Sequence, residues 1–181
     1  MRPMRSTKFL RTHERRRPAA VTTIAAAFVL AAAVLFQVTP MVMAAGWNGI
    51  EPLKSKRADV ERLLGKPLPA QSGEADTLSF KVAGGTVMIL FVDAKFVAAK
   101  RLQPALEGTV LQVVLRHERA TDTPETLGLL KNSSFAREDG QQGVVVFRNL
   151  KDGIYYTFIN GQLKTSRFSP TADQLAGGQR R

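Results

Sequence analysis

The sequence contains no cysteine, and only 2 of its 181 residues are histidine. Without cysteine the chain forms no disulfide, has no thiol nucleophile or lipid-modified cysteine anchor, and offers no thiolate ligand to zinc or an iron–sulfur cluster. His13 lies in a basic N-terminal stretch, which leaves His117 as the only imidazole in the rest of the chain. One imidazole among dispersed carboxylates does not indicate a metal centre. We therefore expect neither a bound metal nor a cofactor.

Acidic residues are fewer than basic ones, 15 against 26, which gives a net charge of +11. Seven of the basic residues and one acidic residue lie in residues 1–17, so the rest of the chain has a net charge of only +5. The other lysines and arginines are scattered among acids, whereas nucleic-acid binding requires basic clusters interleaved with aromatic residues. We expect no nucleic-acid partner. Hydrophobic residues make up 44% of the chain, enough for one compact domain or two very small ones.

Residues 1–46 have the features of a targeting segment. After a basic stretch, residues 18–38 contain no charged side chain and are long enough to span a bilayer. Val42 and Ala44 stand three residues and one residue before a possible signal-peptidase site between Ala44 and Ala45. The apolar run is longer than that of most signal peptides, so an uncleaved membrane anchor is the alternative. We expect a chain exported across the inner membrane, either periplasmic or secreted, or a single-pass inner-membrane protein with its C-terminal domain outside.

Residues 47–119 predict a first unit made of a helix and an antiparallel sheet. Ser55 is a typical helix cap, Val60 and Leu63 recur at helical spacing, and Gly65 ends the helix. Strands are predicted over residues 77–82 and 86–92, near Phe96, and over residues 109–115.

Residues 120–170 predict a second unit of the same kind. Asp122 offers a cap, and Pro124 and Glu125 suit the first turn of a second short helix. Strands are predicted over residues 143–149, 154–159 and 162–169, the last two joined by the hairpin signal Asn160-Gly161. Residues 171–181 are expected to form a flexible tail.

The two units align at a constant offset of 67 residues, which places Phe80 on Phe147 and Phe91 on Phe158. One register serves both the helix and the strands, which favours an internal duplication over two unrelated α+β halves. The predicted fold class is therefore α+β, with two tandem units, each a short helix followed by an antiparallel β-meander, preceded by an N-terminal apolar helix.

Strand alternation assigns the apolar residues to two faces of the predicted sheets. The face expected beneath the helices carries Leu78, Phe80, Val87, Ile89, Phe91, Val145, Phe147, Ile154, Tyr156 and Phe158. The opposite face is also apolar and carries Met88, Leu90, Val92, Val144, Val146, Tyr155 and Ile159. Mutual burial of the two sheets, packed together or continuous, is the simpler explanation of that second face. The functional explanation is a surface that binds another protein, with Tyr155 as its anchor.

Few residues outside the targeting segment are arranged for catalysis. No Gly-x-Ser-x-Gly turn accompanies His117, which we interpret as a solvated loop histidine. Gly84-Gly85 lacks the lysine, serine and following helix of a phosphate-binding loop. Two carboxylate pairs occur, Glu74 with Asp76 and Glu138 with Asp139. Both lie in polar segments, where nothing would raise a carboxyl pKa for acid catalysis. We expect a non-catalytic protein, because an enzyme would need His117 to meet an acid and a hydroxyl in a pocket.

Residues 47–65 resemble the opening of a group of exported bacterial proteins of unknown function that share the pattern Trp-x-Gly-Ile-x-Pro-Leu-x-Ser-x-Arg-x-x-Val-Glu-x-Leu-Leu-Gly. Gly108-Thr109-Val110 matches a Gly-Thr-Val strand of these proteins. A Gly-Ile-x-Tyr strand and hairpin is matched from Gly153 to Pro170. The resemblance covers most of the chain after the targeting segment. The chain lacks the cysteines that some members of the group carry.

A helix ending in Val-x-x-Leu-Leu-Gly-x-Pro and followed by a meander is, more distantly, similar to the SmpA/OmlA (BamE-like) envelope module. Tandem copies of that module resemble the β-lactamase-inhibitor-protein-like fold. The resemblance implies a non-catalytic module that binds other proteins through a sheet face. The chain lacks the lipobox cysteine of the BamE-like lipoproteins, so an outer-membrane location is not implied. The motif residues are structural and imply no active site: Ser55, Val60, Leu63, Leu64, Gly65 and Pro67.

Overall fold

A computed structural model describes residues 45–69 and 76–180 of the chain. The predicted targeting segment lies outside the described residues except for Ala45 and Gly46, and so does Ala44 at the predicted cleavage site. Glu74 of the first carboxylate pair also lies outside them. No helix among the residues that the structure describes is long and apolar enough to cross a membrane.

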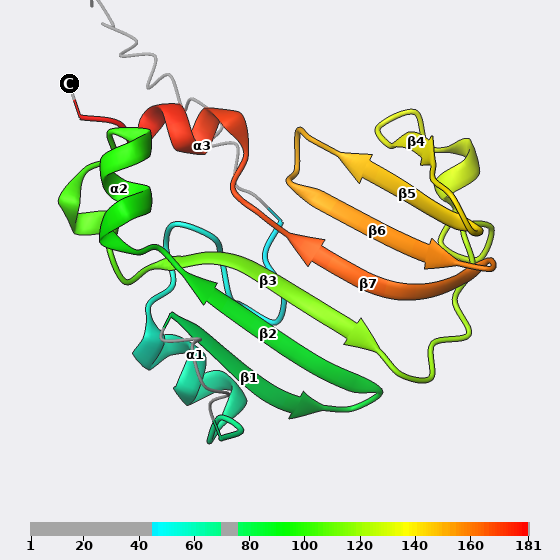
Figure 1. The fold of residues 1–181 in the computed structure, drawn as a ribbon, viewed down its shortest axis with the longest axis horizontal. Coiled ribbons are helices and arrows are strands. Elements are labelled where there is room, and N and C mark those ends of the chain that lie inside the picture. The colour runs from blue at the N-terminus through cyan, green and yellow to red at the C-terminus, as the bar shows by residue number, and fades with distance from the viewer. Residues whose placement is uncertain (1–44, 70–75, 181) are drawn as a thin grey trace, which may run out of the picture. The chain divides into compact units, whose positions relative to one another are not determined.

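The described chain forms one antiparallel sheet of seven strands (Figure 1). The strands are β1 (Thr77–Val82), β2 (Gly85–Phe91), β3 (Val110–His117), β4 (Ala136–Asp139), β5 (Val144–Asn149), β6 (Ile154–Ile159) and β7 (Gln162–Phe168). Their order across the sheet is β1-β2-β3-β7-β6-β5-β4. The α+β class predicted from the sequence is confirmed, and β4 is an edge strand that the sequence did not predict.

Helices are few and short. They are α1 (Arg57–Leu64), α2 (Ala94–Lys100) and α3 (Ala172–Gly177), with the 3-10 turns η1 (Pro104–Leu106) and η2 (Leu129–Lys131). In Figure 1, α2 and α3 lie together at the end of the sheet where β2 finishes and β3 begins.

Helix α1 is the predicted first helix, but Lys56 and not Ser55 takes the cap position. The Asp59 carboxylate accepts the backbone N–H of Lys56 at 3.0 Å. The Ser55 hydroxyl instead accepts the N–H of Glu51 at 2.9 Å and so closes the preceding turn. Val60 is fully buried beneath the helix, whereas Leu63 is 40% exposed.

Three other predicted elements differ from the structure. The strand expected near Phe96 is helix α2, because the Asp93 carboxylate accepts the Phe96 N–H at 2.6 Å and caps a helix there. The flexible tail contains helix α3, whose Thr171 exchanges hydrogen bonds with Gln174 in a capping box. The second helix is reduced to turns and η2, because Gly128 takes a left-handed φ of 66° and ends the helical path after one turn.

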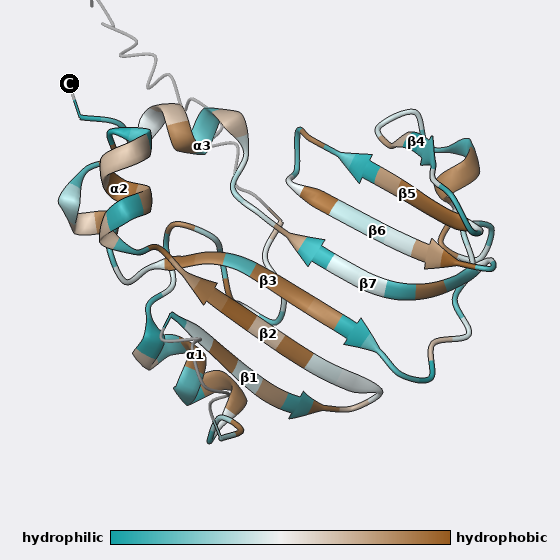
Figure 2. Cartoon of the chain, viewed as in Figure 1, coloured by the Kyte–Doolittle hydropathy of each residue, from teal (hydrophilic) through white to brown (hydrophobic). Residues whose placement is uncertain are grey.

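The hydrophobic core divides into clusters on one face of the sheet and at its end. The larger cluster lies under α1 and contains Val60, Phe80, Ile89 and Val113 among ten buried residues. The second contains Leu129, Phe147, Phe158 and Leu163. The third joins α2, η1 and α3 through Val92, Val97 and Leu102. Hydrophobic residues follow β2 and β3 most continuously (Figure 2).

The face predicted to lie under the helices is the core face of the structure. Six of its ten residues are buried, namely Phe80, Val87, Ile89, Phe91, Phe147 and Phe158. The other four are partly buried against the same clusters: Leu78, Ile154, Val145 and Tyr156.

The two halves of the sheet are joined edge to edge by β3 and β7. Val113 pairs with Phe168 and Arg116 with Thr165 in an antiparallel ladder. The halves are therefore continuous in one sheet and do not stack face to face. Neither half covers the second face of the other.

Candidate functional site

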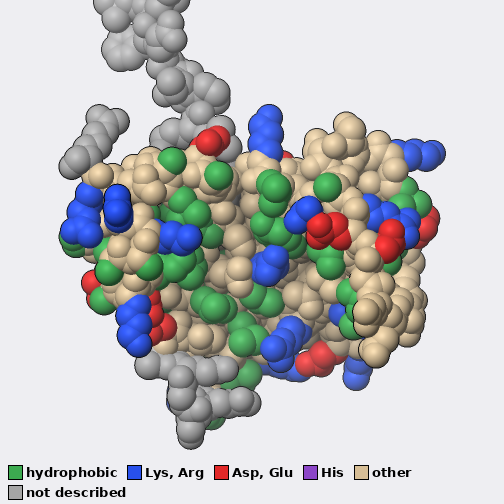
Figure 3. Space-filling view, turned by 45° about the horizontal axis from the view of Figure 1, so that its top comes forward, with side chains coloured by type: hydrophobic (Ala, Val, Ile, Leu, Met, Phe, Trp, Pro, Cys, Tyr) green, Lys and Arg blue, Asp and Glu red, His purple; other side chains and the backbone are tan. Residues whose placement is uncertain are grey.

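The face of the sheet opposite the core face, here called the open face, is the main candidate for a functional site. None of its side chains is buried in the described structure, because the helices and turns pack on the core face or at the sheet end. The open face includes Ser79, Thr86, Met88, Leu90, Gln112, Val114, Arg116, Thr165, Arg167, Tyr155, Thr157, Val144, Val146 and Arg148. On the side drawn in Figure 3, Lys and Arg side chains are distributed among hydrophobic ones.

Six of the seven residues that the sequence assigned to a partner-binding face lie on the open face. Met88 and Leu90 are on β2, Tyr155 and Ile159 on β6, and Val144 and Val146 on β5. Two strands, β3 and β7, separate β2 from β6, so these residues form two patches.

Val92 lies elsewhere. It follows the last residue of β2, is 2% exposed, and packs in the cluster formed with α2 and α3. The sequence could not place it correctly because a strand was expected near Phe96, whereas helix α2 folds against Val92.

The centre of the open face is a row of Arg148, Tyr155 and Arg167, here called the arginine–tyrosine row. Arg148 is opposite Tyr155 in the β5–β6 ladder, and Tyr155 is opposite Arg167 in the β6–β7 ladder. The Arg167 guanidinium carbon lies 4.0 Å from the centre of the Tyr155 ring, a cation–π stack. The same row continues through Val114 on β3 to Met88 on β2, so it links the two apolar patches.

A β-bulge places Arg167 on the open face. Thr157 is opposite Thr165 but Phe158 is opposite Leu163, so Lys164 is an extra residue on β7. Without it, the Asn160-Gly161 turn would put Arg167 opposite Ile154 and on the core face, because a one-residue slip turns every side chain to the other face. This bulge is the reason why alternation along the sequence does not identify Arg167. Arg148 lies in the regular β5–β6 ladder and was missed because the predicted face was defined by apolar side chains alone. The cross-strand position next to Tyr155 is the signal that could have identified Arg148.

Charges on the open face are partly paired. Arg148 forms an ion pair with Glu138 at 2.5 Å. Lys81 pairs with Glu118 at the rim, and the hydrogen bond from Lys81 lowers the pKa of Glu118. In the described ranges, neither Arg116 nor Arg167 has a carboxylate within ion-pair distance.

A second polar site lies on the core face where the two halves meet. The Nε2 atom of His117 is 2.8 Å from the Ser166 hydroxyl. His117 is therefore half-buried and hydrogen-bonded, not the solvated loop residue that we expected. Desolvation lowers its pKa, and the charge of Asp122 acts in the opposite direction. Ser166 is only 5% exposed, which leaves its hydroxyl little access to a substrate.

The His117 site predicts a pH-dependent stability. Because the folded pKa lies below the ordinary value of 6.5, the unfolded state binds more protons in mild acid, and stability falls as pH drops through that value. Chemical denaturation at about pH 7.5 and about pH 5.5, a range above ordinary carboxyl pKa values, measures the loss. We expect His117→Gln to reduce this pH dependence. An unchanged pH dependence in the variant would contradict the assignment.

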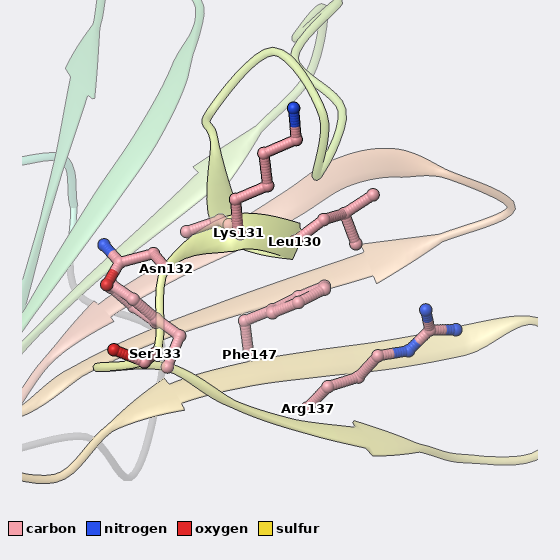
Figure 4. A pocket seen from close by; sticks show the side chains of 8 residues that line it. Leu130, Lys131, Asn132, Ser133, Arg137 and Phe147 are labelled. Carbon is pink, nitrogen blue, oxygen red and sulfur yellow. The ribbon is translucent and has the colours of Figure 1, made fainter.

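A cavity of about 390 Å³ lies on the core face of the second half. It is bounded by residues 129–133, Phe135, Arg137 and Phe147. Figure 4 shows the Phe147 ring beneath the 130–133 segment and Lys131 pointing away from it. Arg137 is held by Asp139 at 2.7 Å. No group of three or more metal-ligating side chains occurs in the part of the chain that the structure describes.

Comparisons with known proteins give little further information. Models of protein families do not match the sequence, and no curated protein matches it. A solved structure with a similar shape is that of a DUF4309 family protein (YjgB) from Bacillus subtilis subsp. subtilis str. 168, with 11% identity and a TM-score of 0.48. The alignment covers 68% of this chain and 83% of that chain. A likeness at this level decides neither family nor function.

Proposed function

We propose that this chain is an exported, non-catalytic envelope protein that binds another protein through the open face. The observation that carries the proposal is a seven-stranded sheet with helices and turns on one face and partly exposed apolar, tyrosine and arginine side chains on the other. Tyrosine, methionine and arginine are the residues enriched in protein interfaces.

The composition of the open face suits a partner that dissociates. Apolar residues such as Met88, Val114 and Val146 supply area, and they alternate with charged and hydroxyl side chains. Such mixed surfaces remain soluble without a partner, whereas permanent interfaces are more hydrophobic. The resemblance to BamE-like modules supports the same function.

We also propose that the sheet arose from two tandem units. The offset of 67 residues relates β1 to β5 residue by residue, and it brings β2 onto most of β6. The strand order supports this, because β1-β2-β3 and β5-β6-β7 are meanders that meet at β3 and β7. The units would have diverged in their covering elements, since α1 has only turns and η2 as its counterpart.

Export is proposed from the N-terminal sequence, with cleavage after Ala44 or retention as an anchor. The Ala45 N–H donates to the Asp152 carbonyl at 2.9 Å, and Trp47 and Ile50 form a bridge over the core. The chain would therefore keep these contacts after cleavage at this site.

Photo-crosslinking in the cells that produce the protein tests the binding proposal. A benzoylphenylalanine at Met88 or Val146, on the open face, is expected to form an adduct with one defined exported protein. The matched control is Leu63, an exposed apolar residue of α1 on the other side of the sheet. The mass of the uncrosslinked protein in the soluble and membrane fractions reports whether residues 1–44 are retained.

Equal adducts from Leu63 and the open face, or none from the open face, would refute the proposed binding surface. A full-length species found only in the membrane fraction would mean that residues 1–44 are retained as a membrane anchor and are not cleaved.

A further inference from the structure

Three arginines gather on the open face around Tyr155. Arg148 and Arg167 flank it on β5 and β7. Arg116 lies diagonally next to Arg167, because Val114, two residues before Arg116, is the residue opposite Arg167. Diagonal neighbours in a sheet are roughly 7–8 Å apart, and strands two places apart are separated by roughly 10 Å. The three guanidinium groups can therefore reach one short segment of a bound chain.

The guanidinium of Arg167 is oriented and incompletely satisfied. Its stack on Tyr155 uses the flat face of the group, which leaves the N–H donors in the guanidinium plane for an acceptor. The Nε atoms of Arg167 and Arg148 are both buried and have no acceptor among the described residues. Leaving a buried donor without an acceptor is unfavourable, so a bound carboxylate would gain from these groups.

The charge balance indicates the sign of the ligand. Glu138 balances Arg148, whereas Arg116 and Arg167 have no acidic partner in the described ranges. Arginine clusters bind carboxylates through paired N–H groups. Glu118 and Glu138 at the edges of the cluster would repel a broad anionic surface such as a lipid bilayer, but not a narrow peptide segment.

We propose that Arg116, Arg167 and Arg148, together with Tyr155, bind an acidic extended segment of the partner protein. The inference rests on the proposed function, since it names the chemistry of the partner at that same face. One carboxylate lies between Arg116 and Arg167 and another reaches Arg148. The apolar patches on either side contact the residues that flank the acidic segment.

Acetylated pentaglutamate is the probe for this proposal. Titrated at low salt into the ¹⁵N-labelled protein as it is recovered from cells, it is expected to shift the Nε–H signals of Arg167 and Arg148. Arg167→Gln should weaken binding about tenfold, and Arg167→Lys should weaken it less. Arg137→Gln is the matched control, because Arg137 lies on the edge strand β4, off the open face, and is paired with Asp139. This control should bind within about twofold of the unmodified protein, and added salt should weaken all binding.

Equal losses from Arg137→Gln and Arg167→Gln would overturn the proposal in favour of diffuse attraction. Absence of Nε–H shifts would also overturn it. So would a result in which the protein binds phosphatidylglycerol vesicles through Arg167 but does not bind pentaglutamate. If pentaglutamate fails while crosslinks from Met88 persist, the open face still binds a partner and only its acidic chemistry is wrong. If the crosslinks fail as well, the proposed function fails with it.

Discussion

Replacing Phe158 by alanine is expected to lower the free energy of unfolding by about 3–5 kcal/mol. Phe158 is fully buried and meets Phe147 edge to face, with ring centres 5.7 Å apart. Its cluster has only four buried residues, so few neighbours can move to fill the space. Such a loss is a large fraction of the stability of a typical domain. Urea denaturation followed by circular dichroism measures it.

The matched control is Ile159→Ala, one residue further along β6. Ile159 is 38% exposed and points to the other face of the sheet. We expect a change within about 0.5 kcal/mol there. A loss from Ile159→Ala as large as that from Phe158→Ala would mean that the open face is buried in the folded protein.

Gly85→Ala is the second large effect that we expect, a loss of about 3 kcal/mol. A Cβ atom at Gly85 would lie 2.0 Å from the carbonyl oxygen of Arg116. Because this oxygen belongs to the backbone of β3, no side chain can move aside, and the β2–β3 ladder must open. Thermal unfolding followed by far-ultraviolet circular dichroism reports the change.

Gly84→Ala is the control for the turn. Gly84 has a left-handed φ of 81° but open space around the added carbon. Only the backbone conformation opposes alanine there, which costs about 1–2 kcal/mol. If Gly84→Ala destabilises the protein more than Gly85→Ala does, then close packing against β3 is not what requires a glycine at position 85.

Much of the sheet could be predicted from local patterns. The alternation Leu78, Phe80, Val82 predicted β1 with its observed bounds, and Asn160-Gly161 predicted the β6–β7 hairpin. These segments follow local rules, because a strand with one buried face shows its period in the sequence. A cap residue and an apolar spacing predicted the second helix. In the structure Gly128 interrupts the helical path, and only turns and η2 form there.

The candidate site was predicted only in part. Alternation selected Met88, Leu90, Val146 and Tyr155, which do share the open face. It could not show that β3 and β7 pair and bring Arg116 next to Arg167, because that pairing joins residues about fifty positions apart. The hydrogen bond between His117 and Ser166 depends on the same pairing.

The sequence by itself determined the α+β class, the meanders and the core face, because each depends on neighbours within a few residues along the chain. The tertiary structure decided that the halves share one sheet, which leaves one face open. It also decided that Lys164 bulges from β7, which turns Arg167 toward Tyr155 and Ser166 toward the core. A bulge is set by the fit between paired strands and their packing, so no local pattern specifies it.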